Sequence, residues 1–140
     1  MQGKKSLTII LHSGDFDKAM AAFIIAAGAA AMGMAVTMFF TFWGLNIVKK
    51  GGIKKSKLSK MNMGGLGTIM MKRAMGKHNV ASLGELMKDC IELDVRLVAC
   101  EMTMDLMHVS KENLIQDVTE IGGVGTYLEA ASDSHINLFI

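Results

Sequence analysis

The stretch from Ala19 to Val48 contains no ionisable side chain, and this feature most restricts how the chain can fold. It is long enough to cross a bilayer as a helix. Its character changes at Gly33, however, because the first half is rich in alanine and the second half, over 36–43, is β-branched and aromatic. An alanine-rich half is typical of a helix, and the second half is typical of a strand buried on both faces. We therefore favour a strand–helix–strand unit, with a membrane span as the open alternative.

The remaining sequence predicts further alternation of strands and helices. Apolar, β-branched runs predict strands over 7–11, 34–42, 95–99, 118–121 and 136–139. Helices are expected up to Met32, over 83–92 with Ser82 as its cap, after Cys100 and over 126–131. Because no proline interrupts this alternation, the sequence predicts a single domain over 1–140, a three-layer α/β fold with a mainly parallel sheet.

The segment at about 51–80 differs from its surroundings in composition. Four lysines between 54 and 60 precede a Met-Asn-Met-Gly-Gly run, and further methionines follow at helical spacing. A methionine-rich segment can cover a pocket or a partner without committing to one packing. The alternative, which we favour, is an amphipathic helix packed on its own domain or on a neighbouring subunit.

Charge and cysteine content restrict the class of protein. The 15 basic and 13 acidic residues give a net charge of +2, and no basic stripe is interleaved with aromatic residues. This argues against nucleic-acid binding. Two cysteines and the absence of a signal-peptide pattern predict a reducing compartment, the cytoplasm.

Cys100 is the leading candidate for chemistry. It follows the apolar run over 95–99 and precedes a segment with helical spacing, so it is expected at the carboxyl end of a buried strand. Helix N–H groups there favour a thiolate, and we expect the sulfur to be exposed to partners and to act as a nucleophile. The neighbouring carboxylate of Glu101 works against the thiolate. The alternative is a buried structural cysteine.

Other candidate residues follow the ends of other strands. In a parallel sheet the functional crevice lies outside the carboxyl ends of the strands. That rule predicts a substrate pocket around Cys100 formed by His12, Ser13, Gly14, Thr41, Trp43, Gly44, Met102, Gly122 and Gly123. We expect Phe42, Trp43 and Met102 to form apolar walls beside Cys100. His12 is interpreted either as a proton carrier or as a strand-end residue bonded to the backbone.

The remaining motifs are less specific. Cys90 shares a helix face with Leu86 and is expected to pack against the sheet, too far from Cys100 for a disulfide. Paired methionines such as Met32 and Met34 would suit cuprous copper, although such pairs more commonly form cores. The glycines over 122–125 give a weak phosphate-binding pattern. We assign no metal site and no cofactor-binding residues.

Three segments together resemble the DsrE/DsrF-like sulfur-relay proteins, in their methionine-rich branch described as peroxiredoxin-like or as a sulfurtransferase. They are Phe-Thr-Phe-Trp-Gly-Leu-Asn over 40–46, Met-Gly-Gly over 63–65, and Val-Ala-Cys-Glu-Met-Thr-Met-Asp-Leu-Met over 98–107. The resemblance covers essentially the whole chain. His108 stands where many members of this branch have glycine.

The resemblance implies a flavodoxin-like α/β subunit that assembles as a trimer or hexamer. It implies that Cys100 accepts sulfane sulfur as a persulfide and relays it to a partner thiol, without a cofactor. Expected donors and acceptors are TusA-like or rhodanese-like proteins, or a small persulfide. The competing hypotheses are a non-catalytic oligomeric ligand-binding or assembly module with an inert Cys100, and a soft-metal carrier. An apolar fraction of 51% independently favours a homo-oligomer.

Overall fold

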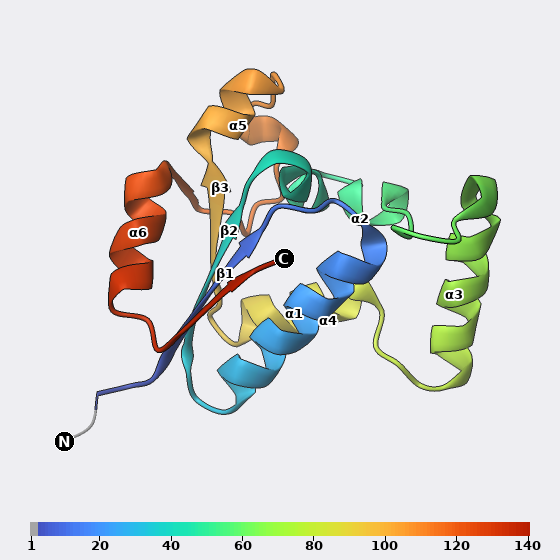
Figure 1. The fold of residues 1–140 in the computed structure, drawn as a ribbon, viewed down its shortest axis with the longest axis horizontal. Coiled ribbons are helices and arrows are strands. Elements are labelled where there is room, and N and C mark those ends of the chain that lie inside the picture. The colour runs from blue at the N-terminus through green and yellow to red at the C-terminus, as the bar shows by residue number, and fades with distance from the viewer. Residues whose placement is uncertain (1–2) are drawn as a thin grey trace.

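A computed structural model describes residues 3–140, so the first two residues of the expected 1–140 domain lie outside it. Five parallel strands form one sheet in the order β4-β3-β2-β1-β5. The strands are β1 (Ser6–Leu11), β2 (Ala35–Phe40), β3 (Arg96–Cys100), β4 (Glu120–Gly122) and β5 (Ile136–Phe139). The three-layer, mainly parallel α/β architecture predicted from the sequence is confirmed (Figure 1).

The longer helices cover the two faces of this sheet unequally. Helices α1 (Phe16–Ala31) and α4 (Leu83–Glu92) pack on one face, and α6 (Val124–Ser132) covers the other (Figure 1). The short helix α5 (Glu101–Leu106) follows β3 at its carboxyl end. The remaining pieces are α2 (Gly52–Lys55), α3 (Leu66–Lys77) and the 3₁₀ turns η1 (Phe42–Val48), η2 (Met63–Gly65) and η3 (Lys111–Asn113).

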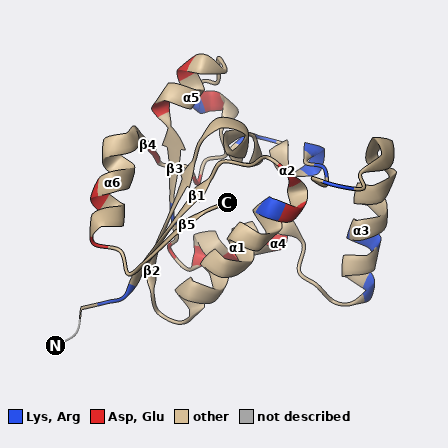
Figure 2. Ribbon diagram, in the orientation of Figure 1, with Lys and Arg blue, Asp and Glu red and all other residues tan. Residues whose placement is uncertain are grey.

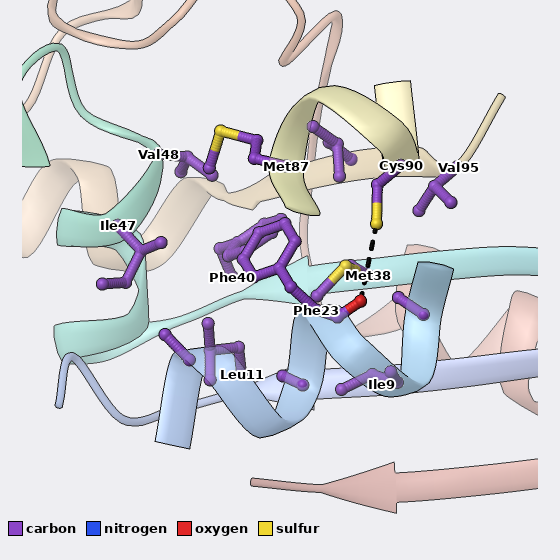
Figure 3. Close-up of a cluster of buried hydrophobic side chains, with 14 of the residues drawn as sticks. Ile9, Leu11, Phe23, Met38, Phe40, Ile47, Val48, Met87, Cys90 and Val95 are labelled. Atoms are coloured by element: carbon purple, nitrogen blue, oxygen red, sulfur yellow. Dashed lines mark hydrogen bonds between the residues drawn. The ribbon is translucent and has the colours of Figure 1, made fainter. Parts of the chain in front are cut away.

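The main hydrophobic core lies between the sheet and the α1–α4 layer. Alternate residues of β1 and β2, including Ile9, Leu11, Met38 and Phe40, are fully buried there. Phe23 of α1 stacks on Phe40 with ring centroids 6.1 Å apart (Figure 3). The opposite face has a smaller buried cluster of Phe39, Val98 and Cys100. Burial on both faces explains why β2 contains almost no polar residue.

The uncharged stretch forms a helix followed by a strand, as the change in character predicts. Helix α1 ends at Ala31, Gly33 turns the chain at a φ of 85°, and β2 pairs with β1 from Ala35 onward. No helix within residues 3–140 is long and apolar enough to cross a membrane. The strand ends at Phe40, earlier than predicted, because Phe42 adopts a φ of 47° and begins η1.

Helix α3 stands apart from the sheet layers, at the right of Figure 1. Only Gly67 and Thr68 are buried within it, and its large apolar side chains Leu66, Ile69, Met70 and Met71 are exposed. Two side chains of α3 contact the domain core: the Lys72 ammonium lies 5.1 Å from the centre of the Phe16 ring, and the partly buried Met75 packs against the main hydrophobic core. The expected packing of this helix on its own domain is confirmed only for the side that carries Lys72 and Met75. Packing on a second subunit stays a prediction.

Candidate functional site

Cys100 occupies the position that the sequence predicts. It is the last residue of β3 and the N-cap of α5, and it pairs with Gly122 of β4. The β-branched run before it forms the strand, and the change to helical spacing at Glu101 begins the helix. Cys100 therefore lies at the edge of the sheet where parallel α/β folds place their ligands.

The Cys100 side chain, however, is buried rather than exposed. Only 5% of the residue is accessible, and it clusters with Phe39 and Val98 on the α6 face. Ile10 and Tyr127 pack against that cluster, and the ring of Tyr127 lies 5.7 Å from that of Phe39. Because side chains alternate along a strand, residues 98 and 100 share the face that α6 covers. The expectation of an exposed sulfur walled by Phe42, Trp43 and Met102 is thus wrong for the single chain.

Four of the predicted residues form one row across the carboxyl edge of the sheet. The strand register aligns one row of residues across the sheet, namely Leu11, Phe40, Ala99 and Ile121. The next row, one residue further along each strand, contains His12, Thr41, Cys100 and Gly122, and in it Cys100 pairs with Gly122. His12 and Cys100 are separated by the intervening β2 chain, a distance of roughly 10 Å at two strand spacings. His12 instead packs with Phe42, Trp43 and Phe139, with ring centroids 5.3–5.5 Å away. The structure therefore does not place His12 as a direct proton carrier for Cys100.

Thr103 joins the segment after Cys100 to the end of β2. Its side chain is fully buried, and its hydroxyl accepts a hydrogen bond of 3.0 Å from the Phe42 N–H. The same hydroxyl lies 3.1 Å from the Thr41 hydroxyl. Phe42 adopts a φ of 47°, which is unusual for a bulky residue. The contact fixes the turn after β2 relative to the first turn of α5.

A pocket of about 700 Å³ lies beside this row, at the ends of β1 and β2. It brings together four of the predicted residues, His12, Ser13, Gly14 and Trp43. Gly44 lies behind its wall, where a Cβ atom would stand 1.9 Å from the Leu11 carbonyl oxygen. That close approach explains why the turn after β2 requires glycine.

The other predicted residues lie elsewhere. Thr41 is bonded to Thr103, Met102 is 54% exposed on α5, and Gly123 precedes α6 as its N-cap. Gly122 lies opposite Cys100, and a Cβ atom there would clash with the Thr126 side chain. The predicted single pocket is therefore divided into a buried sulfur on the α6 face and a separate open pocket.

Lysines line this pocket, and sequence reasoning did not assign them to a site. Lys18, Lys49, Lys50, Lys55 and Lys57 lie around it, with Asp15 as the one acidic lining residue. The sequence does contain a sign of this basic site, because no aspartate or glutamate occurs between Asp17 and Glu85. The fold brings the basic segment that follows η1 back to the carboxyl ends of β1 and β2.

Cys90 behaves as predicted for a core residue. It is inaccessible to solvent, and its Sγ lies 3.8 Å from the Phe23 carbonyl oxygen (Figure 3). Burial, with a smaller effect of the Asp89 charge, raises the pKa of the Cys90 thiol to about 12. Cys90 and Cys100 lie in different buried clusters, and both are free thiols. Within residues 3–140 no three His, Cys, Asp or Glu side chains form a metal-binding group.

Comparisons with known proteins place the chain in a family. Residues 3–58 and 50–139 match the profile of the DsrE/DsrF/DrsH-like family. The chain is 46% identical to "Uncharacterized protein YrkE" of Bacillus subtilis, over 97% of each chain. It is 37% identical to "Sulfur carrier protein DsrE2" of Allochromatium vinosum, over 98% of this chain and 99% of that protein.

Solved structures share the fold at low sequence identity. A protein of unknown function, MTH1491 from Methanobacterium thermoautotrophicum, superposes with a TM-score of 0.62 at 11% identity. It covers 96% of this chain and 99% of its own length. The ychN protein of E. coli gives a TM-score of 0.59 at 12% identity, over 99% of this chain and all of its own. Profile, relatives and fold agree, and the chain belongs to the DsrE/DsrF/DrsH-like family.

Proposed function

We propose that this protein is a sulfur carrier that accepts sulfane sulfur on Cys100 as a persulfide and passes it to a partner thiol. The observation that carries the proposal is the position of Cys100 at the carboxyl edge of the sheet, at the start of α5. Cys90, the other cysteine, lies inside the core with a raised pKa. The relative named as a sulfur carrier, which aligns over nearly the full length, supports the same role.

The proposed transfer follows the rules of thiol–disulfide exchange. The Cys100 thiolate attacks the outer sulfur of a donor persulfide, a new S–S bond forms at Cys100, and the donor leaves as a thiolate. An acceptor thiolate then attacks the outer sulfur of the Cys100 persulfide, and the Cys100 thiolate is the leaving group. The two steps conserve electrons and require no cofactor. Proteins of the TusA or rhodanese type, or a small persulfide, have the chemistry to act as donor and acceptor.

Exposed apolar side chains on α5 and α6, the two helices next to Cys100, support contacts with a partner or a second copy. Met102 and Leu106 project from α5 with 54% and 62% exposure. Val124 and Leu128, one turn apart on α6, are 70% and 56% exposed. Apolar groups gathered on the two elements beside Cys100 are typical of an interaction surface. We propose that a homo-oligomer or a carrier protein docks there.

Intact-protein mass spectrometry tests the proposal. The protein is incubated with polysulfide, or with thiosulfate and a rhodanese, and is analysed without reductant. We expect a gain of one sulfur atom that is lost in Cys100→Ser and retained in the matched variant Cys90→Ala. An adduct that persists in Cys100→Ser would assign sulfur to another residue and reject the proposal.

A second candidate function is a non-catalytic oligomeric binding or assembly module. The burial of Cys100 to 5% exposure favours it, because an inert sulfur packs in this way. The two functions differ in alkylation by iodoacetamide at neutral pH. A sulfur carrier labels at Cys100 much faster than at Cys90, whereas an inert module labels slowly at both.

A further inference from the structure

The pocket at the ends of β1 and β2 carries a large excess of positive charge. Five lysines and one aspartate line its volume of about 700 Å³, which lies within the usual range for small-molecule sites. Asp15 is already neutralised by Lys18, with Nζ and Oδ2 3.5 Å apart. Within residues 3–140 none of the other four lysines, Lys49, Lys50, Lys55 and Lys57, forms an ion pair. The pocket therefore presents several positive charges that no protein carboxylate satisfies.

The surroundings of the pocket do not supply the missing negative charge. Figure 2 shows basic residues on α2, on the connection to α3 and on α3 itself, and acidic residues mainly on α4, α5 and α6. Asp17, at the start of α1, is engaged by the N–H and hydroxyl of Ser59 at 2.8 and 2.7 Å. The pKa of Glu112 is lowered mainly by its backbone hydrogen bond and by a hydrogen bond with Ser110, and the charge of Lys50 has the smallest effect. The electrostatic interaction between Glu112 and Lys50 is therefore weak. An anionic ligand could therefore form ion pairs with the pocket lysines without displacing a protein carboxylate.

The pocket lies at the carboxyl edge of the sheet, beyond the ends of β1 and β2. In open α/β sheets the crevice outside the carboxyl ends of the strands is the general location of bound ligands. His12 and Ser13, which directly follow β1, line the pocket, and their N–H groups donate hydrogen bonds to the Ile140 oxygen after β5. Charge and position at the sheet edge therefore both point to this pocket.

One wall of the pocket is aromatic. Trp43 is 56% exposed and stacks on Phe42 with ring centroids 5.6 Å apart, and it forms a T-shaped pair with the His12 ring at a centroid distance of 5.5 Å. An exposed indole held by two aromatic neighbours offers a fixed surface for a planar group. Gly52 and Asn46 also line the pocket, and their backbones are closely packed, because a Cβ on Gly52 would stand 1.7 Å from the Asn46 carbonyl oxygen. The loop that carries the lysines is thereby held against η1.

We propose that this pocket binds an organic diphosphate with a planar ring, of the nucleoside diphosphate class. The lysines Lys49, Lys50, Lys55 and Lys57 bind the phosphate groups as point charges, and Trp43 stacks with the ring. The site does not use Cys100. It therefore stands or falls separately from the sulfur-carrier function.

The chain offers a direct assay, because Trp43 is its single tryptophan. Tryptophan fluorescence, excited at a wavelength where adenine does not absorb, is measured during titration with ADP and with inorganic pyrophosphate. Isothermal titration calorimetry is run on the same samples as a second measurement. We expect both anions to saturate, with ADP binding at least about fivefold more tightly because base–aromatic stacking adds to the diphosphate contacts.

Charge-removing variants distinguish a specific binding site from general attraction to a basic surface. We expect a loss of about tenfold in affinity for both ligands from each of the single variants Lys49→Gln, Lys55→Gln and Lys57→Gln, because each removes one charged hydrogen bond. The matched control is Lys60→Gln with Lys77→Gln, which removes two charges of the same segment that do not line the pocket. Trp43→Leu, followed by calorimetry, should abolish the preference for ADP over pyrophosphate.

The outcomes are distinct. Equal weakening by the control and the pocket variants would show general electrostatic attraction and overturn the proposal. No saturable heat or fluorescence change with either anion at millimolar concentration would also overturn it. Saturation by pyrophosphate with no preference for ADP would overturn the ring-binding part and leave a phosphate-class anion site. Cys100→Ser should bind ADP as the parent protein does, whatever the result of the persulfide experiment.

Discussion

Replacement of Thr103 by valine tests the connection that holds α5 to the end of β2. The change keeps the shape of a fully buried side chain and removes its hydroxyl. Loss of the hydroxyl leaves the Phe42 N–H without its partner at 3.0 Å, which costs about 1 kcal/mol for a half-buried donor. Loss of the bond to the Thr41 hydroxyl costs about 1 kcal/mol more. We therefore expect Thr103→Val to lower the free energy of unfolding by about 2 kcal/mol.

Urea denaturation with matched controls measures this loss. Thr41→Val in the Thr103→Val background should cost almost nothing further, because the hydroxyl pair is already broken. Thr103→Ser keeps the hydroxyl and should lose only about 0.8 kcal/mol, for one buried methyl group. If Thr103→Val were within about 0.5 kcal/mol of the parent protein, the two hydrogen bonds would contribute no net stability and the reasoning would fail. Fully additive losses for Thr41 and Thr103 would refute the proposed coupling.

Three further perturbations test other parts of the fold by chemical denaturation. The pKa of Cys90 is about 12 in the folded protein and about 9 as a free thiol, so stability should fall as pH rises from 9 to 12; Cys90→Ala should reduce that slope, and equal slopes would contradict the assignment. Glu120→Gln removes the half-exposed ion pair between Glu120 and Arg96 and should lower the free energy of unfolding by about 0.5 kcal/mol at pH 7. Because the Arg96 hydrogen bond lowers the pKa of Glu120, this cost should shrink as pH falls below 4.5, and a pH-independent cost would argue against it. His108→Gly should raise stability by about 0.5–1 kcal/mol, since His108 adopts a φ of 53°, and a loss of stability would show compensating contacts of the imidazole.

Much of the architecture could be predicted because local patterns and tertiary packing agree. The capping box of Ser82 and Glu85 forms as the sequence indicates, with both hydrogen bonds present. The last strand has the predicted bounds, Ile136–Phe139. The fourth strand was predicted over 118–121 and lies at Glu120–Gly122. Glu120 is a charged residue within this short strand, and its ion pair with Arg96 on β3 provides a stabilisation that no local pattern reveals.

The candidate site was harder to predict, because it depends on which face each residue occupies. The rule for parallel sheets located His12, Thr41, Cys100 and Gly122 correctly at one edge. It could not show that α6 crosses over Cys100, because that helix is contributed by a chain segment more than twenty residues later. The pocket lysines were missed for a similar reason. Their segment reads as a solvent-exposed basic run, and only the tertiary fold brings it back to β1 and β2.

The way in which α6 packs determines whether the buried Cys100 can react. Helix α1 buries seven residues against the sheet and α4 buries four, whereas α6 buries none. Elements with few buried apolar contacts open at a lower free energy than the whole domain. We therefore expect alkylation of Cys100 to proceed through local opening of α6, at a rate that low urea concentrations barely change. Cys90, held between α1 and the sheet, should instead label only on global unfolding, with a rate that rises steeply with urea. If both cysteines showed the same urea dependence, α6 would open only with the whole domain, and Cys100 could not exchange sulfur in the free chain.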